Sequence, residues 1–460
     1  MFSIKVSARC VKVIRHFLLP RPRRLVAPNC LKCNENAGAI PLLGNPLHRF
    51  AASLRYNSAH RETATTEGDS MEPDYPFMPQ DQPTSKIAPE LGLQPETPAS
   101  PPEPQKFARL RRVFLGPQGL RAGWSVLLFI FLSAIILTAL ALGIATFAGM
   151  KQHAKPTTLS PFPALASEAI KVIAILIAGF VMARIERRRL ADYYLAGQHR
   201  FTHFLGGLAA GFLALSALVG ALAWGHWLHF GPVALSGWRI LGFAAIWAIV
   251  FILTGLFEEG SFRCYLQFTL TRGINFWWAL GIVAALCLSG ALRTHADGIG
   301  GVYVIALLGL VPCLVLYLKR NARAGFWHAA WATSTFFGFV HTGNNGETWI
   351  GIFSAAAIGF VFCVSIWVTG SAWWAIGCHA SWDWAETYFY GTADSGLIAK
   401  GHLLTTSPAG NAFWSGGTTG PEGSVLILGV LVLLLAALLL IYGRKSALPD
   451  PSQAPAQLTS

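Results

Sequence analysis

The apolar residues of this chain are concentrated in ten segments, and the polar residues gather in the loops between them. A helix needs about 20 apolar residues to cross the hydrocarbon core of a bilayer. The fourth segment exceeds one flat span, so we expect it to be tilted or broken, and the fifth and seventh are short. The segments are residues 123–148, 163–183, 204–227, 239–270, 276–292, 301–318, 325–341, 349–368, 371–389 and 424–442. The pattern predicts an all-α, multi-pass transmembrane helix bundle of about 8–10 spans.

The chain before the first apolar segment has a different character. Residues 1–70 are expected to be basic and poorly ordered, because positions 1–62 hold eleven Lys or Arg residues against two acids. This composition resembles an organellar transit peptide, and a translation start at Met71 is the alternative. Residues 71–122 combine a disordered, Pro-rich tether with a basic juxtamembrane segment; ten prolines lie between positions 71 and 104. Such a Pro-rich stretch builds no core of its own.

Composition and charge agree with a membrane domain at residues 123–442, followed by a short polar tail at 443–460. Apolar residues make up 53% of the chain and charged residues 12%, against about 25% charged residues in soluble domains. The net charge of +13 is spread between apolar segments, so we expect no nucleic-acid partner. The loops on one side receive seventeen Lys or Arg residues and the other side five. The positive-inside rule then predicts cytoplasmic N- and C-termini. We expect the membrane to be a bacterial plasma membrane or, alternatively, an organellar membrane.

Three polar clusters interrupt the apolar segments. An ionisable residue inside a span costs about 2.5–3.5 kcal/mol, so such residues are usually functional or tightly paired. The clusters are Glu258-Glu259-Gly260-Ser261-Phe262-Arg263, Phe337-Gly338-Phe339-Val340-His341 and His379-Ala380-Ser381-Trp382-Asp383.

Helix geometry relates the members of each cluster. Glu259 and Arg263 are four residues apart, which predicts an ion pair on one helix face. Glu258 is rotated by about 100° from Glu259, so it is left available for chemistry. His379 and Asp383 also share a face. At about 1.5 Å per residue, Glu258 and His341 lie about 21 and 25 Å from the inner ends of their helices, and His379 and Asp383 lie about 14 and 20 Å from theirs. All four therefore fall within the middle of a ~30 Å core.

The order EExxxR, FxxxH and HxxxN/D on separate helices resembles the CPBP family, the CAAX proteases and bacteriocin-processing enzymes also called Abi. The resemblance covers residues 239–390, the motif core of the membrane domain. It implies an intramembrane endopeptidase that works without a metal. By this resemblance Glu258 and His341 would activate a water molecule, and His379 would stabilise the oxyanion with help from Asp383. The supporting residues would be Glu259, Arg263 and Phe337.

Asp383 departs from the pattern, because the prenyl-proteases of the family have Asn at this position. An ionised Asp would repel an oxyanion, whereas a protonated one could donate to it. Asp383 could instead orient His379 as an acceptor. The sequence does not identify the substrate, a peptide or a membrane-protein loop in the lipid bilayer, or say whether it is prenylated. It also leaves the oligomeric state open.

Other functions remain as alternatives. Buried carboxylates and histidines also form proton relays in transporters, and the Pro-rich tether could belong to a non-catalytic membrane scaffold. We expect no cofactor, but two Glu and two His residues are acceptable zinc ligands, so zinc is the alternative. No HExxH motif is present, which argues against a zinc metalloprotease of that class.

Overall fold

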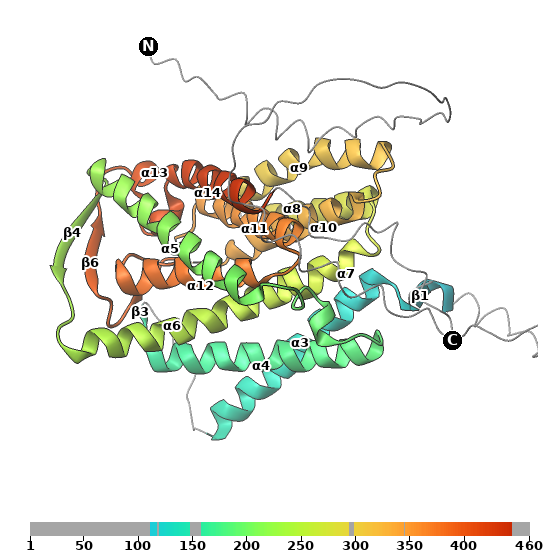
Figure 1. Cartoon of the computed structure of the whole chain (residues 1–460), viewed down its shortest axis with the longest axis horizontal. Coiled ribbons are helices and arrows are strands. Elements are labelled where there is room, and N and C mark those ends of the chain that lie inside the picture. The colour runs from blue at the N-terminus through green and yellow to red at the C-terminus, as the bar shows by residue number, and fades with distance from the viewer. Residues whose placement is uncertain (1–110, 117–118, 148–157, 294–298, 345, 444–460) are drawn as a thin grey trace, which may run out of the picture. The chain divides into compact units, whose positions relative to one another are not determined.

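The computed structural model describes residues 111–116, 119–147, 158–293, 299–344 and 346–443 (Figure 1). All of them belong to one compact unit, residues 97–460. The segment expected at 1–70, most of 71–122 and all but the first residue of the tail at 443–460 lie outside the described residues.

Every apolar segment of the sequence folds as a helix within a few residues of its expected bounds. The helices are α3 (Ala122–Phe147), α4 (Pro161–Ile185), α5 (Arg200–Trp224), α6 (Trp238–Glu259), α7 (Phe268–Thr271), α8 (Phe276–Arg293), α9 (Gly300–Leu318), α10 (Ala324–His341), α11 (Trp349–Thr369), α12 (Trp373–Asp383) and α14 (Leu426–Tyr442). In the described part of the chain, six helical stretches are long and apolar enough to cross a membrane. The predicted multi-pass helical bundle is confirmed.

Two of the helices contain π-helical segments. The π-helix Gly260–Gln267 joins α6 to α7, so the fourth apolar segment runs without a break from Trp238 to Thr271. The π-helix Trp384–Phe389 follows α12 directly. Such π-helical turns widen the helix and often occur at functional sites.

Short strands and turns close one end of the bundle. Strand β4 (Leu228–Val233) pairs antiparallel with β6 (Leu404–Pro408), and β3 (Thr158–Leu159) pairs parallel with β5 (Ile398–Ala399). We call residues 390–423 the cap; besides β5 and β6 it contains the short helix α13 (Ala412–Ser415) and the 3₁₀ turn Pro421–Gly423. Strands β1 (Leu115–Gly116) and β2 (Gly119–Leu120) lie at the opposite end of the bundle (Figure 1).

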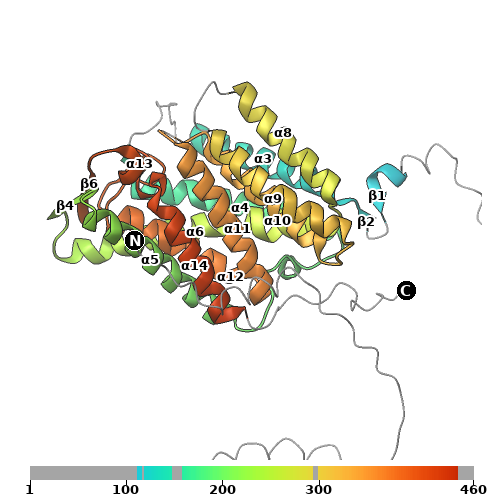
Figure 2. The same cartoon turned by 90° about the horizontal axis from the view of Figure 1, so that it is seen from above.

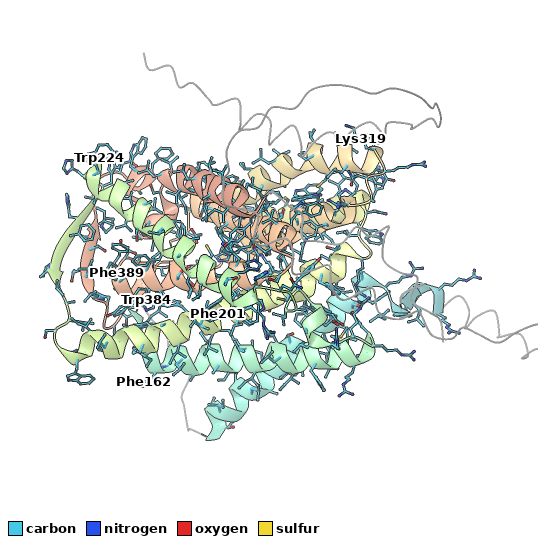
Figure 3. The ribbon with its side chains drawn as sticks, in the orientation of Figure 1. Phe162, Phe201, Trp224, Lys319, Trp384 and Phe389 are labelled. Carbon is cyan, nitrogen blue, oxygen red and sulfur yellow. The ribbon has the colours of Figure 1, made fainter. Side chains whose placement is uncertain are left out.

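The two ends of the bundle carry different side chains. Trp224 and Phe162 project outward near the end that carries β4 and β6, and Lys319 lies at the other end (Figure 3). Trp224 is 88% exposed and Phe162 is 74% exposed. Aromatic side chains are enriched where a membrane meets water, and basic residues favour the cytoplasmic side. Both features suit helices that cross a bilayer.

Glycine allows α5 and α12 to approach each other closely. A side chain on Gly207 would collide with the carbonyl of Trp374, and one on Gly211 would collide with the carbonyl of Cys378. Small residues at such spacing let membrane helices pack backbone against backbone. The contact fixes the position of α12 and hence of His379, the residue after Cys378.

A glycine also allows α6 to pack closely against α12. A Cβ on Gly255 would lie 3.0 Å from the carbonyl oxygen of Ile376. Gly255 precedes Glu258 by less than one turn, and Ile376 precedes His379 by the same interval. The close approach therefore carries the first and third polar clusters to the same depth. Seen from above, α8 and α9 lie at the edge of the bundle, next to α10 (Figure 2).

Candidate active site

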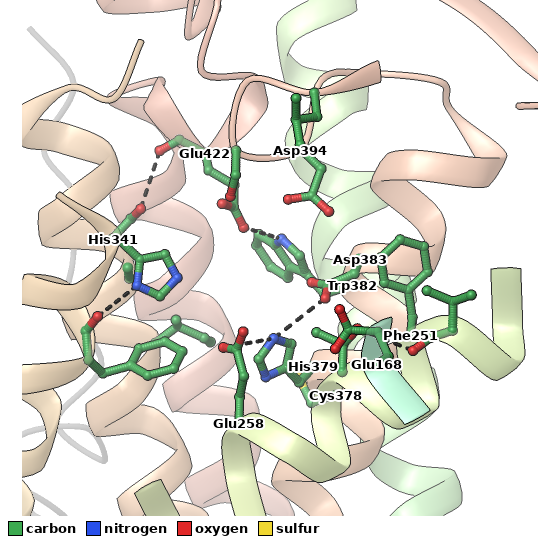
Figure 4. A pocket seen from close by; sticks show the side chains of 18 of the residues that line it. Glu168, Phe251, Glu258, His341, Cys378, His379, Trp382, Asp383, Asp394 and Glu422 are labelled. Carbon is green, nitrogen blue, oxygen red and sulfur yellow. Dashed lines mark hydrogen bonds and ion pairs between the residues drawn. The ribbon is translucent and has the colours of Figure 1, made fainter. Parts of the chain in front are cut away.

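A cavity of about 310 Å³ lies between the cap and helices α4, α6, α10, α11 and α12. Glu258, His341, His379 and Asp383 all line it, and so does Phe337 (Figure 4). Three sequence clusters separated by up to about 120 residues thus converge on one space. The shared layer that was expected from helix geometry corresponds to a single cavity.

His379 is held by one ring nitrogen and faces the cavity with the other. Its Nδ1–H donates to Oε1 of Glu259 at 2.8 Å. Its Nε2 lies 3.5 Å from Oδ2 of Asp383 and 3.8 Å from Oε2 of Glu258. The ring stacks on Phe362, with 5.8 Å between centroids. His379 is therefore fixed in orientation and presents Nε2 to the cavity (Figure 4).

Behind His379, Glu259 and Arg263 form the ion pair expected from their spacing. Arg263 Nε lies 3.1 Å from Glu259 Oε2, and both side chains are fully buried. The guanidinium lies 4.3 Å from the ring centroid of Phe337 and 5.5 Å from that of Phe362. Aromatic faces attract a desolvated cation, so they compensate in part for its burial. Glu259 thus connects Arg263 to His379, a link that the sequence analysis did not include.

Glu258 differs from Glu259 in its surroundings. Its side chain is 24% exposed and its described ion-pair distance, to His379 Nε2, is 3.8 Å. That distance is longer than a hydrogen bond. A carboxylate with oxygens free to face a cavity can accept a proton from a bound water molecule.

His341 is oriented by its own helix. Its Nδ1 lies 2.6 Å from the carbonyl oxygen of Phe337, one turn earlier, so this nitrogen carries the hydrogen. The ring also packs on the Phe337 ring, with 4.7 Å between centroids. Nε2 is therefore left as the nitrogen that can engage a water molecule. No described hydrogen bond or ion pair joins His341 to Glu258, so a bridging molecule would have to connect them.

Both π-helices begin immediately after acidic residues of the site. One starts at Gly260, after Glu259, and the other starts at Trp384, after Asp383. A π-helical turn changes the direction in which the following side chains project. Nothing in the apolar pattern of the sequence signals these two segments.

Several polar residues that line the cavity were not predicted from the sequence. Glu168 and Lys171 of α4 form an ion pair at 2.5 Å. Their presence inside the apolar segment 163–183 was a signal that could have been used. Asp394 and Glu422 of the cap also line the cavity, but loop residues carry no periodic signal.

The two cap carboxyl groups are tied to the helices beneath them. Trp382 Nε1–H donates to Glu422 Oε1 at 2.7 Å, and the Thr387 hydroxyl donates to Asp394 Oδ2 at 3.0 Å. Burial raises the pKa of Asp394, and it raises the pKa of Glu422 to about 8. The cap is thus anchored over the cavity through acidic side chains.

The suitability of the site for zinc can be judged from its donors. Within the described ranges, no group of three or more His, Cys, Asp or Glu side chains is arranged to hold a metal ion. Glu259 and His379 bond to each other, and Glu259 also pairs with Arg263. Two of the four residues considered as zinc ligands, Glu259 and His379, are therefore committed to each other, whereas Glu258 and the Nε2 atom of His341 face the cavity.

A comparison with known protein families finds a match in the part of the chain that surrounds the cavity. A model of the family described as type II CAAX prenyl endopeptidase Rce1-like matches residues 240–325 and 314–385. This range includes all three polar clusters and coincides with the motif core at 239–390. No curated protein and no solved structure matches the chain. The resemblance to the CPBP family is confirmed, and the match supports an endopeptidase embedded in a membrane.

Proposed function

We propose that this chain is a CAAX-protease-like intramembrane endopeptidase that hydrolyses peptide bonds with a water molecule activated by Glu258 and His341. The observation that carries the proposal is the convergence of Glu258, His341 and His379 on one cavity. The family match over residues 240–385 supports the same reaction class.

In the proposed mechanism, the attacking water lies between Glu258 and Nε2 of His341. Glu258 takes a proton from the water as its oxygen bonds to the scissile carbonyl carbon. The carbonyl oxygen becomes an oxyanion and accepts a hydrogen bond from His379 Nε2–H; His379 is doubly protonated in this proposal, because its Nδ1–H already donates to Glu259. When the tetrahedral intermediate collapses, the C–N bond breaks and Glu258 returns its proton to the leaving amine.

Glu259, Arg263 and Phe337 have positioning roles in this proposal. Glu259 holds His379 through Nδ1, and Arg263 holds Glu259. The Phe337 carbonyl orients His341. Removal of either Glu259 or Arg263 would leave the other with an uncompensated buried charge. Glu259, Arg263 and His379 are therefore expected to act as a unit.

Asp383 is proposed to act in its protonated form as a second donor to the oxyanion. Its Oδ2 lies 3.5 Å from the cavity-facing nitrogen of His379. The alternative role, orientation of His379, has less support because Glu259 already accepts from Nδ1.

We further propose that both termini are cytoplasmic, in a bacterial plasma membrane or alternatively an organellar one. The substrate would be a peptide or a membrane-protein loop that reaches the cavity past the cap. The distribution of basic residues supports this orientation.

The test is proteolysis by the purified full chain in lipid nanodiscs. A pool of peptides and membrane-protein loops is incubated with wild type, Glu258→Ala, His379→Ala and the control Asp192→Ala, and the products are identified by mass spectrometry. Asp192 pairs with Arg189 outside the cavity and should not affect cleavage. Wild type and control should cleave the same bonds, with or without a chelator. Cleavage that persists in Glu258→Ala contradicts the mechanism, and peptide uptake into sealed proteoliposomes without cleavage favours a transporter.

A further inference from the structure

The cavity contains more acidic than basic side chains. Its lining includes the carboxyl groups of Glu168, Glu258, Asp383, Asp394 and Glu422. The lysine that lines it, Lys171, is paired with Glu168 at 2.5 Å. The proposed mechanism uses Glu258 and Asp383, so it leaves the two cap carboxyl groups, Asp394 and Glu422, without a role.

A third carboxyl group lies close to the two cap residues. Glu386, in the π-helix after α12, is fully buried behind the residues that line the cavity, and neither of its carboxylate oxygens has a hydrogen-bond partner among the described residues. The carboxyl groups that act on it electrostatically are those of Glu422, Asp394 and Asp383. Across the described ranges, no Lys or Arg forms an ion pair with Glu386, Asp394 or Glu422. A buried carboxylate without a counter-charge is costly, so such a group keeps its proton unless a ligand supplies a cation.

The shape of this cluster favours an organic cation over a metal ion. The described carboxyl groups are too dispersed to form a metal-binding set. An ammonium or guanidinium group has several donors and can reach separate acceptors. Trp247, Phe251 and Trp382 also line the cavity, and they offer apolar surface to the methylene groups that such a side chain carries.

We propose that Asp394 and Glu422, with Glu386 buried behind them, form a subsite for the Lys or Arg side chain of a substrate residue near the scissile bond. The inference rests on the proposed function and adds a substrate class to it. The basic side chain passes along the aromatic wall, and its charged end lies beside the carboxyl groups of Asp394 and Glu422 beneath the cap, with the carboxyl group of Glu386 behind them. Substrates with a neutral or acidic residue at that position leave these groups without a partner.

The test compares matched peptides. A peptide that wild type cleaves is remade, with an acetylated N-terminus, with Lys, Arg, norleucine or Glu at each position around the scissile bond. At one position, Lys and Arg should raise kcat/KM by about tenfold or more over norleucine, since buried charge pairs are strongly coupled. The double variant Asp394→Asn/Glu422→Gln should lose this preference and still cleave the norleucine peptide. Equal cleavage of all four peptides by wild type overturns the subsite and leaves the proposed protease standing.

A binding measurement separates failure of the subsite from failure of the proposed function. N-acetyl-lysine methylamide and its norleucine counterpart are added to the full chain, and thermal unfolding is followed. Dose-dependent stabilisation by the lysine compound alone, absent in Asp394→Asn/Glu422→Gln and retained in Asp192→Asn, supports the subsite even if no peptide is cleaved. Equal effects of the two compounds on wild type overturn it.

Discussion

Two glutamates in this protein, Glu186 and Glu258, differ in what surrounds them. Glu186 follows α4 at the basic end of the bundle and accepts hydrogen bonds from Tyr193 at 3.2 Å, Tyr265 at 3.0 Å and Arg272 at 2.7 Å. Its side chain is 3% exposed. Glu258 faces the cavity, and its described partner, His379 Nε2, is 3.8 Å away.

The difference separates a structural carboxylate from a chemically available one. A carboxylate has about four acceptor positions, and the partners of Glu186 occupy most of them. Glu258 keeps its acceptor positions free for water or substrate. A buried acid in a membrane protein therefore indicates catalysis when its oxygens remain open to a cavity, and indicates stability when partners saturate them.

The largest expected effect is on catalysis. Glu258→Gln should lower kcat/KM for a cleaved peptide by about 10²–10⁴-fold, because the amide cannot accept the proton of water. Its thermal unfolding temperature should stay close to that of wild type, since Glu258 has no hydrogen bond to lose. Steady-state kinetics and a thermal unfolding curve on the same preparation check both expectations.

The opposite result is expected for Glu186, whose acceptor positions are mostly occupied. Glu186→Gln should lower the free energy of unfolding by about 3 kcal/mol, because it leaves the charge of Arg272 poorly compensated. The kcat/KM per folded molecule should stay near the wild-type value, since no described contact links this site to the cavity. Denaturant unfolding in detergent measures the first quantity. A variant with normal stability and lost activity would remove the distinction between the two glutamates.

A smaller effect on activity is expected when the packing that positions α12 and His379 is disturbed. Gly211→Ala places a methyl group against the carbonyl of Cys378, so α12 and His379 must shift. Activity should fall by about tenfold, since displacements of about 1 Å can cost up to about 10²-fold. Gly220→Ala, on the same helix with open space around it, is the matched control and should behave as wild type. Equal activity in the two variants would show that α12 is not held by this contact.

The smallest effect is a pH dependence that comes from the cap. Glu422 has a pKa raised by burial to about 8, and Asp394 and Glu347 nearby are raised in the same direction. The folded state therefore keeps protons that the unfolded state releases above about pH 4.5. Stability should be greatest near or below that pH and decline up to about pH 8. The unfolding temperature of Glu422→Gln should fall less over this range, and a rise with pH in wild type would contradict the assignment.

Much of the fold followed from the apolar pattern, because a bilayer imposes segment length directly. The spacing of Glu259 and Arg263 was also sufficient to predict their ion pair. The bond from His379 to Glu259 could not be predicted, since it joins helices that are far apart in the sequence. Before the fold was known, Arg263 accounted for Glu259 fully.

Other features had no sequence signal or had one that was overlooked. Glu168 lies inside an apolar segment and was overlooked, although burial of an acid is costly there. Asp394 and Glu422 belong to a loop, and their place over the cavity depends on how the cap folds back. The role of Asp383 depends on which nitrogen of His379 it approaches, and the spacing of the two residues in the sequence does not determine that.

The central claim is that Glu258 and His341 act on the same water molecule. A double-mutant cycle on kcat/KM with Glu258→Gln, His341→Ala and the combined variant tests it most directly, because groups that act as a unit have non-additive effects. We predict that the double variant is about as slow as the slower single variant. Two losses that multiply, or a His341→Ala variant with wild-type activity, would contradict the claim.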